Sequence, residues 1–127
     1  MKFEKGYSPI RAYSNTKVAN ILFTRHLARR LRDTNIQVFS LHPGVVQSSL
    51  GRNLSFAHSL VSMLLGVLCK KTNEGAQTTV YCALEAKQDD EHHYFSDCAV
   101  GYTSKLARDE RAAKKLWNLS EKMVGLQ

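Results

Sequence analysis

A helix that leads directly into an apolar strand is the feature that most constrains the fold of this 127-residue chain. Residues 11–32 favour a helix, because apolar side chains recur at helical spacing on one face. That face holds Val18, Ala19, Ile21, Leu22, Leu27, Ala28 and Leu31. Asn35 suits a left-handed exit, and the run Ile36–Leu41 is nearly continuously apolar and rich in β-forming residues. The pattern predicts an α/β fold with a parallel sheet.

The rest of the chain predicts two further helices and one further strand. One helix begins at Thr72 or Asn73, and the last one opens at Ser104 and stops at Gly125. Tyr94–Cys98 is the second expected strand. The inward faces of the two helices are expected to hold Ala76, Val80, Ala83 and Leu84 in the first, and Ala112, Ala113, Leu116, Leu119 and Met123 in the second.

The most hydrophobic stretch, Leu54–Cys69, is shorter than the roughly 20 apolar residues that span a bilayer. An apolar binding lid, a core helix and an interfacial segment remain as alternatives. The net charge of +7 favours anionic partners. Much of the excess lies in Arg25, His26, Arg29, Arg30 and Arg32. We interpret these as a solvated helix face, with an anionic membrane surface as the alternative, and expect no nucleic-acid partner because no recognition motif accompanies the charge.

The three cysteines, Cys69, Cys82 and Cys98, are widely spaced without a Cys-x-x-Cys pair. Free thiols in a reducing compartment therefore fit best. His92 and His93 lie near Asp97 and Cys98 in the sequence, but no second cluster at ligand spacing accompanies them. We expect no metal site and interpret both histidines as turn and surface residues.

Tyr13 and Lys17 are four residues apart, so on a helix their side chains share a face. An ammonium near a phenol favours the phenolate, which suits Tyr13 to general acid or base chemistry. Taken alone, the pair is a weak signal, because a Tyr and a Lys at this spacing occur by chance on many helices, where the tyrosine packs and the lysine is solvated.

The segment from His42 to Ser48 follows the predicted strand and contains a Pro43-Gly44 turn. In open α/β sheets, ligands bind beyond the carboxyl ends of the strands, where this segment is expected. Proline would stiffen the turn, glycine would let backbone approach a flat ring, and the Ser48 hydroxyl could bond a carboxamide. Together with Tyr13 and Lys17, the turn indicates redox chemistry on a nicotinamide cofactor.

These residues resemble the short-chain dehydrogenase/reductase family, whose hallmarks are a Tyr-x-x-x-Lys helix and a Pro-Gly turn after the next strand. Five runs are similar to its retinol dehydrogenase branch: Tyr13–Thr24, Leu41–Val46, Glu74–Thr78, Tyr94–Cys98 and Leu116–Ser120. The resemblance covers the carboxyl-terminal part of a family member. It implies one truncated domain over residues 1–127, with about two strands and three to four helices of a Rossmann-type doubly wound parallel sheet, lacking the amino-terminal nucleotide-binding half.

The resemblance also implies roles for individual residues. Tyr13 would exchange a proton with the substrate oxygen, and Lys17 would bond the nicotinamide ribose. Pro43, Gly44 and Val46 would pack beside the nicotinamide, where Ser48 replaces the family's usual threonine. The cofactor would be NADP and the substrate a retinoid or another apolar aldehyde or alcohol. Leu54–Cys69 would line the substrate site and touch the membrane.

The family's glycine-rich cofactor loop and carbonyl-polarising serine are not found ahead of Tyr13. We therefore expect the isolated chain to be an inactive, truncated oxidoreductase, intracellular and either cytoplasmic or peripheral to the endoplasmic reticulum membrane. The alternative is a non-catalytic module. It would form a homodimer or heterodimer through the basic helix or through the open edge of the Ile36–Leu41 strand.

Overall fold

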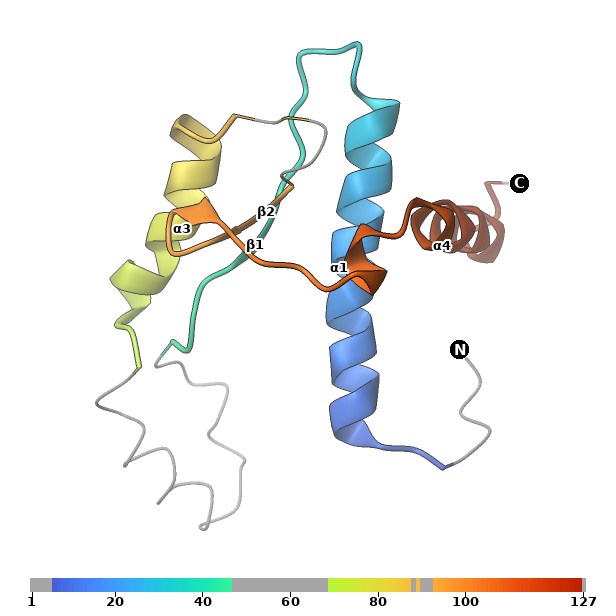
Figure 1. Ribbon diagram of the computed structural model, residues 1–127, viewed down its shortest axis with the longest axis horizontal. Helices are drawn as coiled ribbons and strands as arrows, with labels where there is room; N and C mark the ends of the chain where they lie inside the picture. The colour runs from blue at the N-terminus through green and yellow to red at the C-terminus, as the bar shows by residue number, and fades with distance from the viewer. Residues whose placement is uncertain (1–5, 47–68, 88, 90–92, 127) are drawn as a thin grey trace. The chain divides into compact units, whose positions relative to one another are not determined.

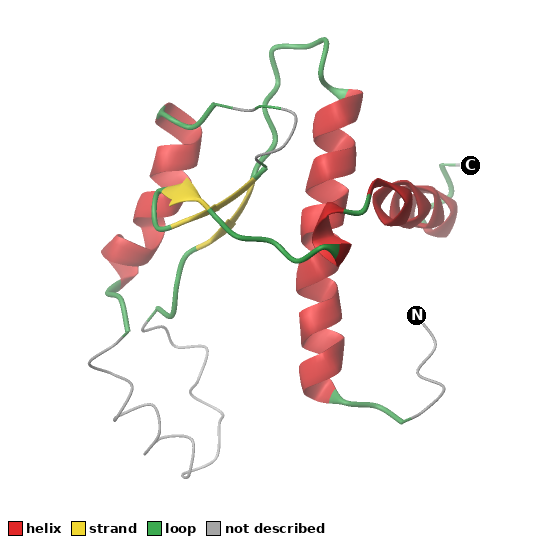
Figure 2. Ribbon diagram, in the orientation of Figure 1, coloured by secondary structure: helices red, strands yellow, loops and turns green. Residues whose placement is uncertain are grey.

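The structure is a computed structural model that describes residues 6–46, 69–87, 89 and 93–126. Its elements, in chain order, are α1 (Pro9–Arg30), β1 (Ser40–His42), α3 (Thr72–Leu84), β2 (Tyr94–Ser96), β3 (Ala99–Val100), the 3₁₀ helix η2 (Leu106–Arg108) and α4 (Glu110–Met123) (Figure 1). The fold is α/β, as predicted, with a small mixed sheet of order β1-β2-β3 (Figure 2). The described residues form two compact units. One contains α1, η2 and α4, and the other contains α3 and most of the sheet.

Helix α1 confirms the predicted helix, but it starts two residues earlier, so Pro9 and Ile10 are helical. The Ser8 side chain accepts a hydrogen bond from the Arg11 amide at 3.5 Å, and Pro9 occupies the first turn, where no amide donor is needed. The left-handed exit expected at Asn35 is wrong, because its φ is not positive. Instead the Thr34 hydroxyl donates to the Leu31 carbonyl at 2.7 Å and closes the turn.

The first unit is held by the packing of α1 against α4 and η2. The buried side chains of these elements are mostly small, since Ala28, Ala107 and Ala113 are each at most 3% exposed. Methyl groups let helices approach closely. In Figure 1, α1 runs lengthwise while α4 is seen almost end-on, so the two helices cross steeply. The Trp117 ring of α4 stacks on Phe23 of α1, with centroids 5.0 Å apart.

Two arginines of α1 pair with acidic residues of α4. Arg29 forms an ion pair with Glu110. Arg30 lies 3.4 Å from Glu121, and its guanidinium carbon is 4.9 Å from the Trp117 ring centroid. Both arginine side chains remain partly exposed, at 36% and 54%, so the expected solvated face also carries ion pairs with another helix of the chain. They complement α4 within the chain.

Helix α4 begins later than predicted. Ser104 instead opens η2, where its hydroxyl accepts from the Ala107 amide at 3.3 Å. Asp109 caps α4 by accepting from the Arg111 amide at 2.8 Å. Gly125 follows the helix with φ of +75°, which confirms the predicted stop.

The inward face predicted for α4 is partly wrong. Ala113 is buried, but Leu119 is 49% exposed and Met123 is 78% exposed. Trp117 occupies the face toward α1 through its contacts with Phe23 and His26. One large ring therefore takes the place that the apolar periodicity assigned to Leu119 and Met123.

The sheet confirms that the two predicted strands are neighbours, although β1 is shorter than the predicted run and starts four residues later. Both the amide and the hydroxyl of Ser40 donate to the His93 carbonyl, at 2.9 and 3.0 Å. His93 is only 4% exposed, so its interpretation as a surface residue is wrong. β2 continues through a turn into β3, which the sequence did not predict, and the two pair antiparallel. β1 lies at one end of the strand order, while pairing with another chain stays a prediction.

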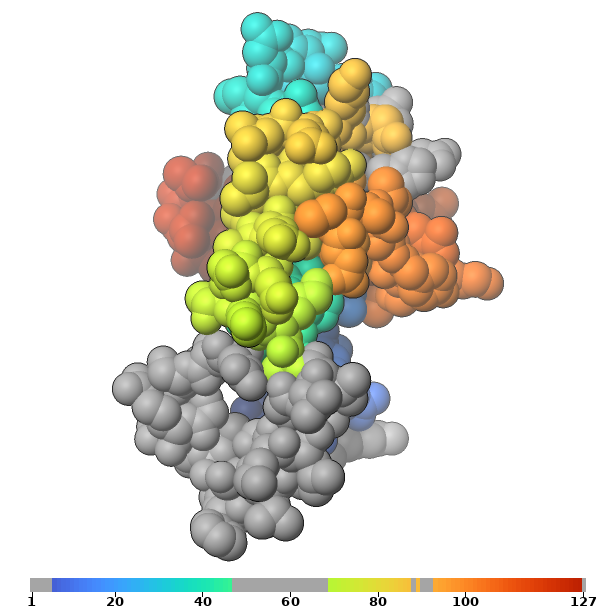
Figure 3. Space-filling view, turned by 90° about the vertical axis from the view of Figure 1, so that its left-hand side faces the viewer, coloured from blue at the N-terminus to red at the C-terminus, as the bar shows by residue number. Residues whose placement is uncertain are grey.

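Helix α3 confirms the predicted helix, but its buried face differs from the prediction. Gly75 and Thr78 are buried, whereas Val80 is 53% exposed and Leu84 is 77% exposed. Ala76 and Ala83 are exposed as well. Figure 3 looks onto this outer surface of α3. The buried positions of α3 are thus a glycine and a threonine, whose contacts are described below with the site, and not its apolar residues.

The pH dependence of stability is expected to reflect His26, whose ring lies tilted against Trp117 with ring centroids 5.0 Å apart. Burial lowers the pKa of His26 below 6.5, and Arg30, Arg29 and Lys114 lower it further against the opposing charge of Glu121. Below about pH 6.5 the unfolded chain therefore binds more protons at this position than the folded chain does. The stability that neutral His26 contributes is complete above about pH 6.5 and is lost as the pH falls below that value.

We expect the urea midpoint to fall between pH 7.5 and pH 5.5, followed by far-UV circular dichroism. His26→Phe keeps a ring against Trp117 but cannot titrate, so its midpoint should change less over the same interval. If the urea midpoint of His26→Phe falls between pH 7.5 and pH 5.5 as much as that of the original chain, His26 is not the group responsible for the pH dependence.

A second prediction concerns Gly75, where an added Cβ would lie 2.5 Å from Cγ2 and 3.1 Å from Cγ1 of Val46. Gly75→Ala gains about 1 kcal/mol of helix propensity, but overpacking costs about 1–3 kcal/mol. We expect a net loss of about 1 kcal/mol in the free energy of unfolding, measured by urea titration.

The matched control is Gly75→Ala in a Val46→Ala background, where the clash is absent. There the same substitution should be neutral or stabilising. Equal destabilisation in both backgrounds would exclude the contact with Val46 as the cause.

Candidate functional site

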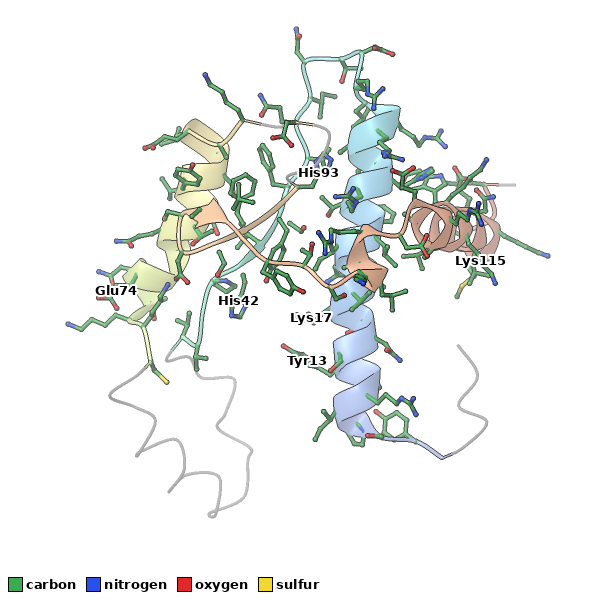
Figure 4. The ribbon with its side chains drawn as sticks, viewed as in Figure 1. Tyr13, Lys17, His42, Glu74, His93 and Lys115 are labelled. Atoms are coloured by element: carbon green, nitrogen blue, oxygen red, sulfur yellow. The ribbon has the colours of Figure 1, made fainter. Side chains whose placement is uncertain are left out.

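Tyr13 and Lys17 lie on the same side of α1, as predicted from their spacing (Figure 4). The Lys17 ammonium is 5.1 Å from the centroid of the Tyr13 ring. Tyr13 is 64% exposed, so its phenol is accessible to a ligand. The Thr16 hydroxyl donates to the Tyr13 carbonyl at 2.7 Å, so the Thr16 side chain is bonded to the backbone of α1. The pair combines an accessible phenol with a nearby ammonium.

The Pro43-Gly44 turn follows β1, also as predicted. Gly44 has φ of +83°, a conformation that residues with a Cβ rarely adopt. A Cβ at this position would lie 3.1 Å from Cδ of Lys70. The Lys70 amide donates to the Val45 carbonyl at 2.8 Å, and Val46 forms an isolated parallel bridge with Lys70. The turn is therefore held by the segment that leads into α3.

Lys70 and Asp97 are site-bordering residues that the sequence interpretation missed. Their side chains form an ion pair. The hydrogen bond and the charge of Lys70 hold the pKa of the Asp97 carboxyl below its ordinary value, with smaller contributions from Ser96 and His42. The sequence assigned no role to Lys70, and Asp97 entered only through the run Tyr94–Cys98 and its closeness to His92 and His93. Nothing in their 27-residue separation signals the contact.

The run Glu74–Thr78 has a structural explanation in this fold. The Glu74 carboxylate accepts from the Lys71 amide at 2.6 Å and so caps α3. Gly75 makes room for Val46, and the buried Thr78 hydroxyl accepts from the Cys98 amide at 3.3 Å. These three residues orient α3 against the turn and the β2–β3 hairpin. A shallow groove on α3, lined in part by Ala76, Val80 and Tyr81, contains none of the predicted site residues.

The predicted site residues fall into the two units, each of which is described by itself. Tyr13 and Lys17 belong to the first, and Pro43, Gly44 and Val46 belong to the second. Ser48 and residues 54–68 of the predicted substrate segment lie outside the described residues. Whether these groups act together stays a prediction.

Among the described residues, the exposed Tyr13 phenol and the Lys17 ammonium are the predicted groups that could bond the hydroxyls of a bound ribose. Cys69, Cys82 and Cys98 are free thiols. Within residues 6–46, 69–87, 89 and 93–126, no group of three or more acidic, histidine or cysteine side chains is arranged to hold a metal ion. In the same ranges, no helix has the length and hydrophobicity needed to cross a membrane.

Comparison with known proteins identifies relatives along the whole chain. The family model described as short chain dehydrogenase matches residues 2–58. Retinol dehydrogenase 12 of Mus musculus is 42% identical over 125 residues, which are 98% of this chain and 39% of that protein. Retinol dehydrogenase 12 of Homo sapiens is 41% identical over 128 residues, covering 100% of this chain and 40% of that protein. Retinol dehydrogenase 11 of Homo sapiens is 43% identical over 124 residues, covering 97% and 39%.

The chain thus spans about two fifths of the length of these relatives. The segment matched by the family model contains Tyr13, Lys17 and the Pro43-Gly44 turn, the residues whose arrangement was just described. The chain belongs to the short-chain dehydrogenase family, as a part that is similar to retinol dehydrogenases.

Proposed function

We propose that this chain supplies the proton-transfer residues of an oxidoreductase that interconverts an apolar aldehyde and alcohol, such as a retinoid pair, with NADP. One observation carries the proposal. The Tyr13 phenol is 64% exposed on α1, and the Lys17 ammonium lies 5.1 Å from its ring centroid. The names of the relatives, retinol dehydrogenases 11 and 12, support an apolar alcohol as the substrate class.

Tyr13 is the general acid in the direction of reduction. Its hydroxyl donates a proton to the carbonyl oxygen of the substrate, and in the reverse direction the phenolate accepts the proton of the alcohol. The nicotinamide, when bound, supplies or accepts the hydride at the carbon. Lys17 stabilises the phenolate that remains after proton donation, because its ammonium is held on the same helix face. The same ammonium donates to the ribose hydroxyls, which orients the cofactor toward Tyr13.

Pro43, Gly44, Val46 and Ser48 are proposed to pack beside the nicotinamide. The support for the first three is a turn of defined shape after β1, with the positive φ of Gly44 and the bridge between Val46 and Lys70. A turn held in this way presents a fixed surface to a flat ring. Ser48 is assigned from the family motif alone.

Turnover is proposed to require a polypeptide that binds the phosphates of the dinucleotide. Lys17 and the Pro43-Gly44 turn contact only the nicotinamide end in this proposal, and a cofactor held at one end is poorly oriented for hydride transfer. The chain matches about two fifths of its relatives, so the remaining part of a relative is the natural complement.

The test is complementation with the part of Homo sapiens retinol dehydrogenase 12 that has no counterpart in this chain. NADPH-dependent conversion of retinal to retinol would be followed by chromatography. Tyr13→Phe removes the proton donor but keeps the ring, so we expect the rate to fall about 10²- to 10⁴-fold. Tyr102→Phe, at a tyrosine that is 86% exposed, should leave the rate unchanged.

If the complemented mixture is active and Tyr13→Phe retains the full rate, the assignment of Tyr13 is wrong. If the mixture shows no turnover while the intact relative is active in the same assay, the chain does not supply these residues in a competent form. Either result would overturn the proposed function.

A further inference from the structure

Lys70 contacts two segments that are distant from it in the sequence. Its backbone amide donates to Val45 at 2.8 Å, and its side chain pairs with Asp97. The first contact reaches the Pro43-Gly44 turn and the second reaches the turn between β2 and β3. One residue therefore joins both turns at the start of α3.

The side chain of Lys70 lies against Gly44. An added Cβ at Gly44 would be 3.1 Å from Cδ, 3.2 Å from Cε and 3.3 Å from Nζ of Lys70. The methylene chain thus covers one side of the glycine while the ammonium continues to Asp97. A long aliphatic stem that ends in a cation fits both Gly44 and Asp97. An apolar or a short polar residue would fit only one of these two neighbours.

Asp97 is held in an unusual backbone conformation. Its φ is +53°, and that of Cys98 is +56°. The Ser96 hydroxyl donates to the Asp97 carboxylate at 3.3 Å, and the Cys98 amide donates to Thr78 at 3.3 Å. The Cys98 amide therefore ties the hairpin turn to α3, and the neighbouring Asp97 carboxylate pairs with Lys70 from the same turn.

We propose that Lys70 is the positioning residue of the Pro43-Gly44 turn, which it holds through Val45 and through its ion pair with Asp97. The inference rests on the proposed function, because this turn is the surface assigned to the nicotinamide. Lys70 acts through the turn. Its methylene chain lies against Gly44, its backbone forms the bridge with Val46, and its ammonium pairs with Asp97.

The first experiment measures the turn in the free chain by NMR hydrogen exchange at the amides of Gly44, Val45 and Val46. Lys70→Met keeps the aliphatic stem and loses the charge. Asp97→Asn keeps a residue that tolerates a left-handed backbone and also loses the charge. Because the pair is partly exposed, each variant should speed exchange at these amides about two- to fivefold.

Two further variants separate positioning from general stability. Lys71→Met changes the adjacent exposed lysine and should leave exchange at the turn unchanged. Lys70→Arg keeps a long stem and a cation, so it should retain the exchange rates of the original chain. No change in Asp97→Asn, or no retention in Lys70→Arg, would overturn the role of the ion pair.

The second experiment titrates reduced nicotinamide mononucleotide into the same variants and follows the turn amides. Lys70→Met and Asp97→Asn should raise the dissociation constant about two- to fivefold, in proportion to their effect on exchange. Unchanged affinity despite faster exchange would remove the link between the turn and the nicotinamide. Absence of binding by the original chain would count against the proposed nicotinamide site, and the exchange data would still decide whether Lys70 positions the turn.

Discussion

The close approach of α1 to α4 and η2 is the constraint on which the first unit depends. Ala28, Ala107 and Ala113 provide the small buried surfaces, and Trp117 fills the space beside them. The α1 side chains that lie against the Trp117 ring include Phe23, His26 and Arg30, which are in the second half of the helix. Tyr13 lies nine residues before Leu22, about 13 Å along the helix axis. The proposed catalytic pair is therefore carried on a part of α1 that extends beyond these contacts, which leaves the Tyr13 phenol exposed.

The second unit is organised by close contacts and hydrogen bonds around small or polar residues. Three contacts join segments that are far apart in the sequence. Gly75 lies against Val46, Thr78 is bonded to Cys98, and Lys70 is bonded to Val45. A missing side chain, a buried hydroxyl and a backbone amide are specific in position but contribute little buried apolar area. This is why a substitution as small as Gly75→Ala is expected to lower the free energy of unfolding.

The sequence was most informative where the determining interactions are local. The helix around Tyr13 and Lys17 and their shared face follow from residues three to four apart, and both were predicted. The buried face of α3 was not predicted correctly. Apolar periodicity selects Val80 and Leu84, whereas Gly75 and Thr78 are the buried residues. A glycine that makes room for a distant valine carries no hydrophobic signal. The pairing of Arg29 with Glu110 was missed because the two residues are 81 positions apart in the sequence.

The Pro43-Gly44 turn shows how a motif residue can have a structural cause beside a functional one. The sequence suggested that glycine lets a flat ring approach the backbone, but Gly44 has positive φ and the direction of its absent Cβ points toward Lys70. Glycine is thus required there by the backbone and by a neighbouring side chain of the same protein. The case for redox chemistry accordingly depends less on this glycine than on Tyr13 and Lys17, whose phenol and ammonium share one exposed face of α1.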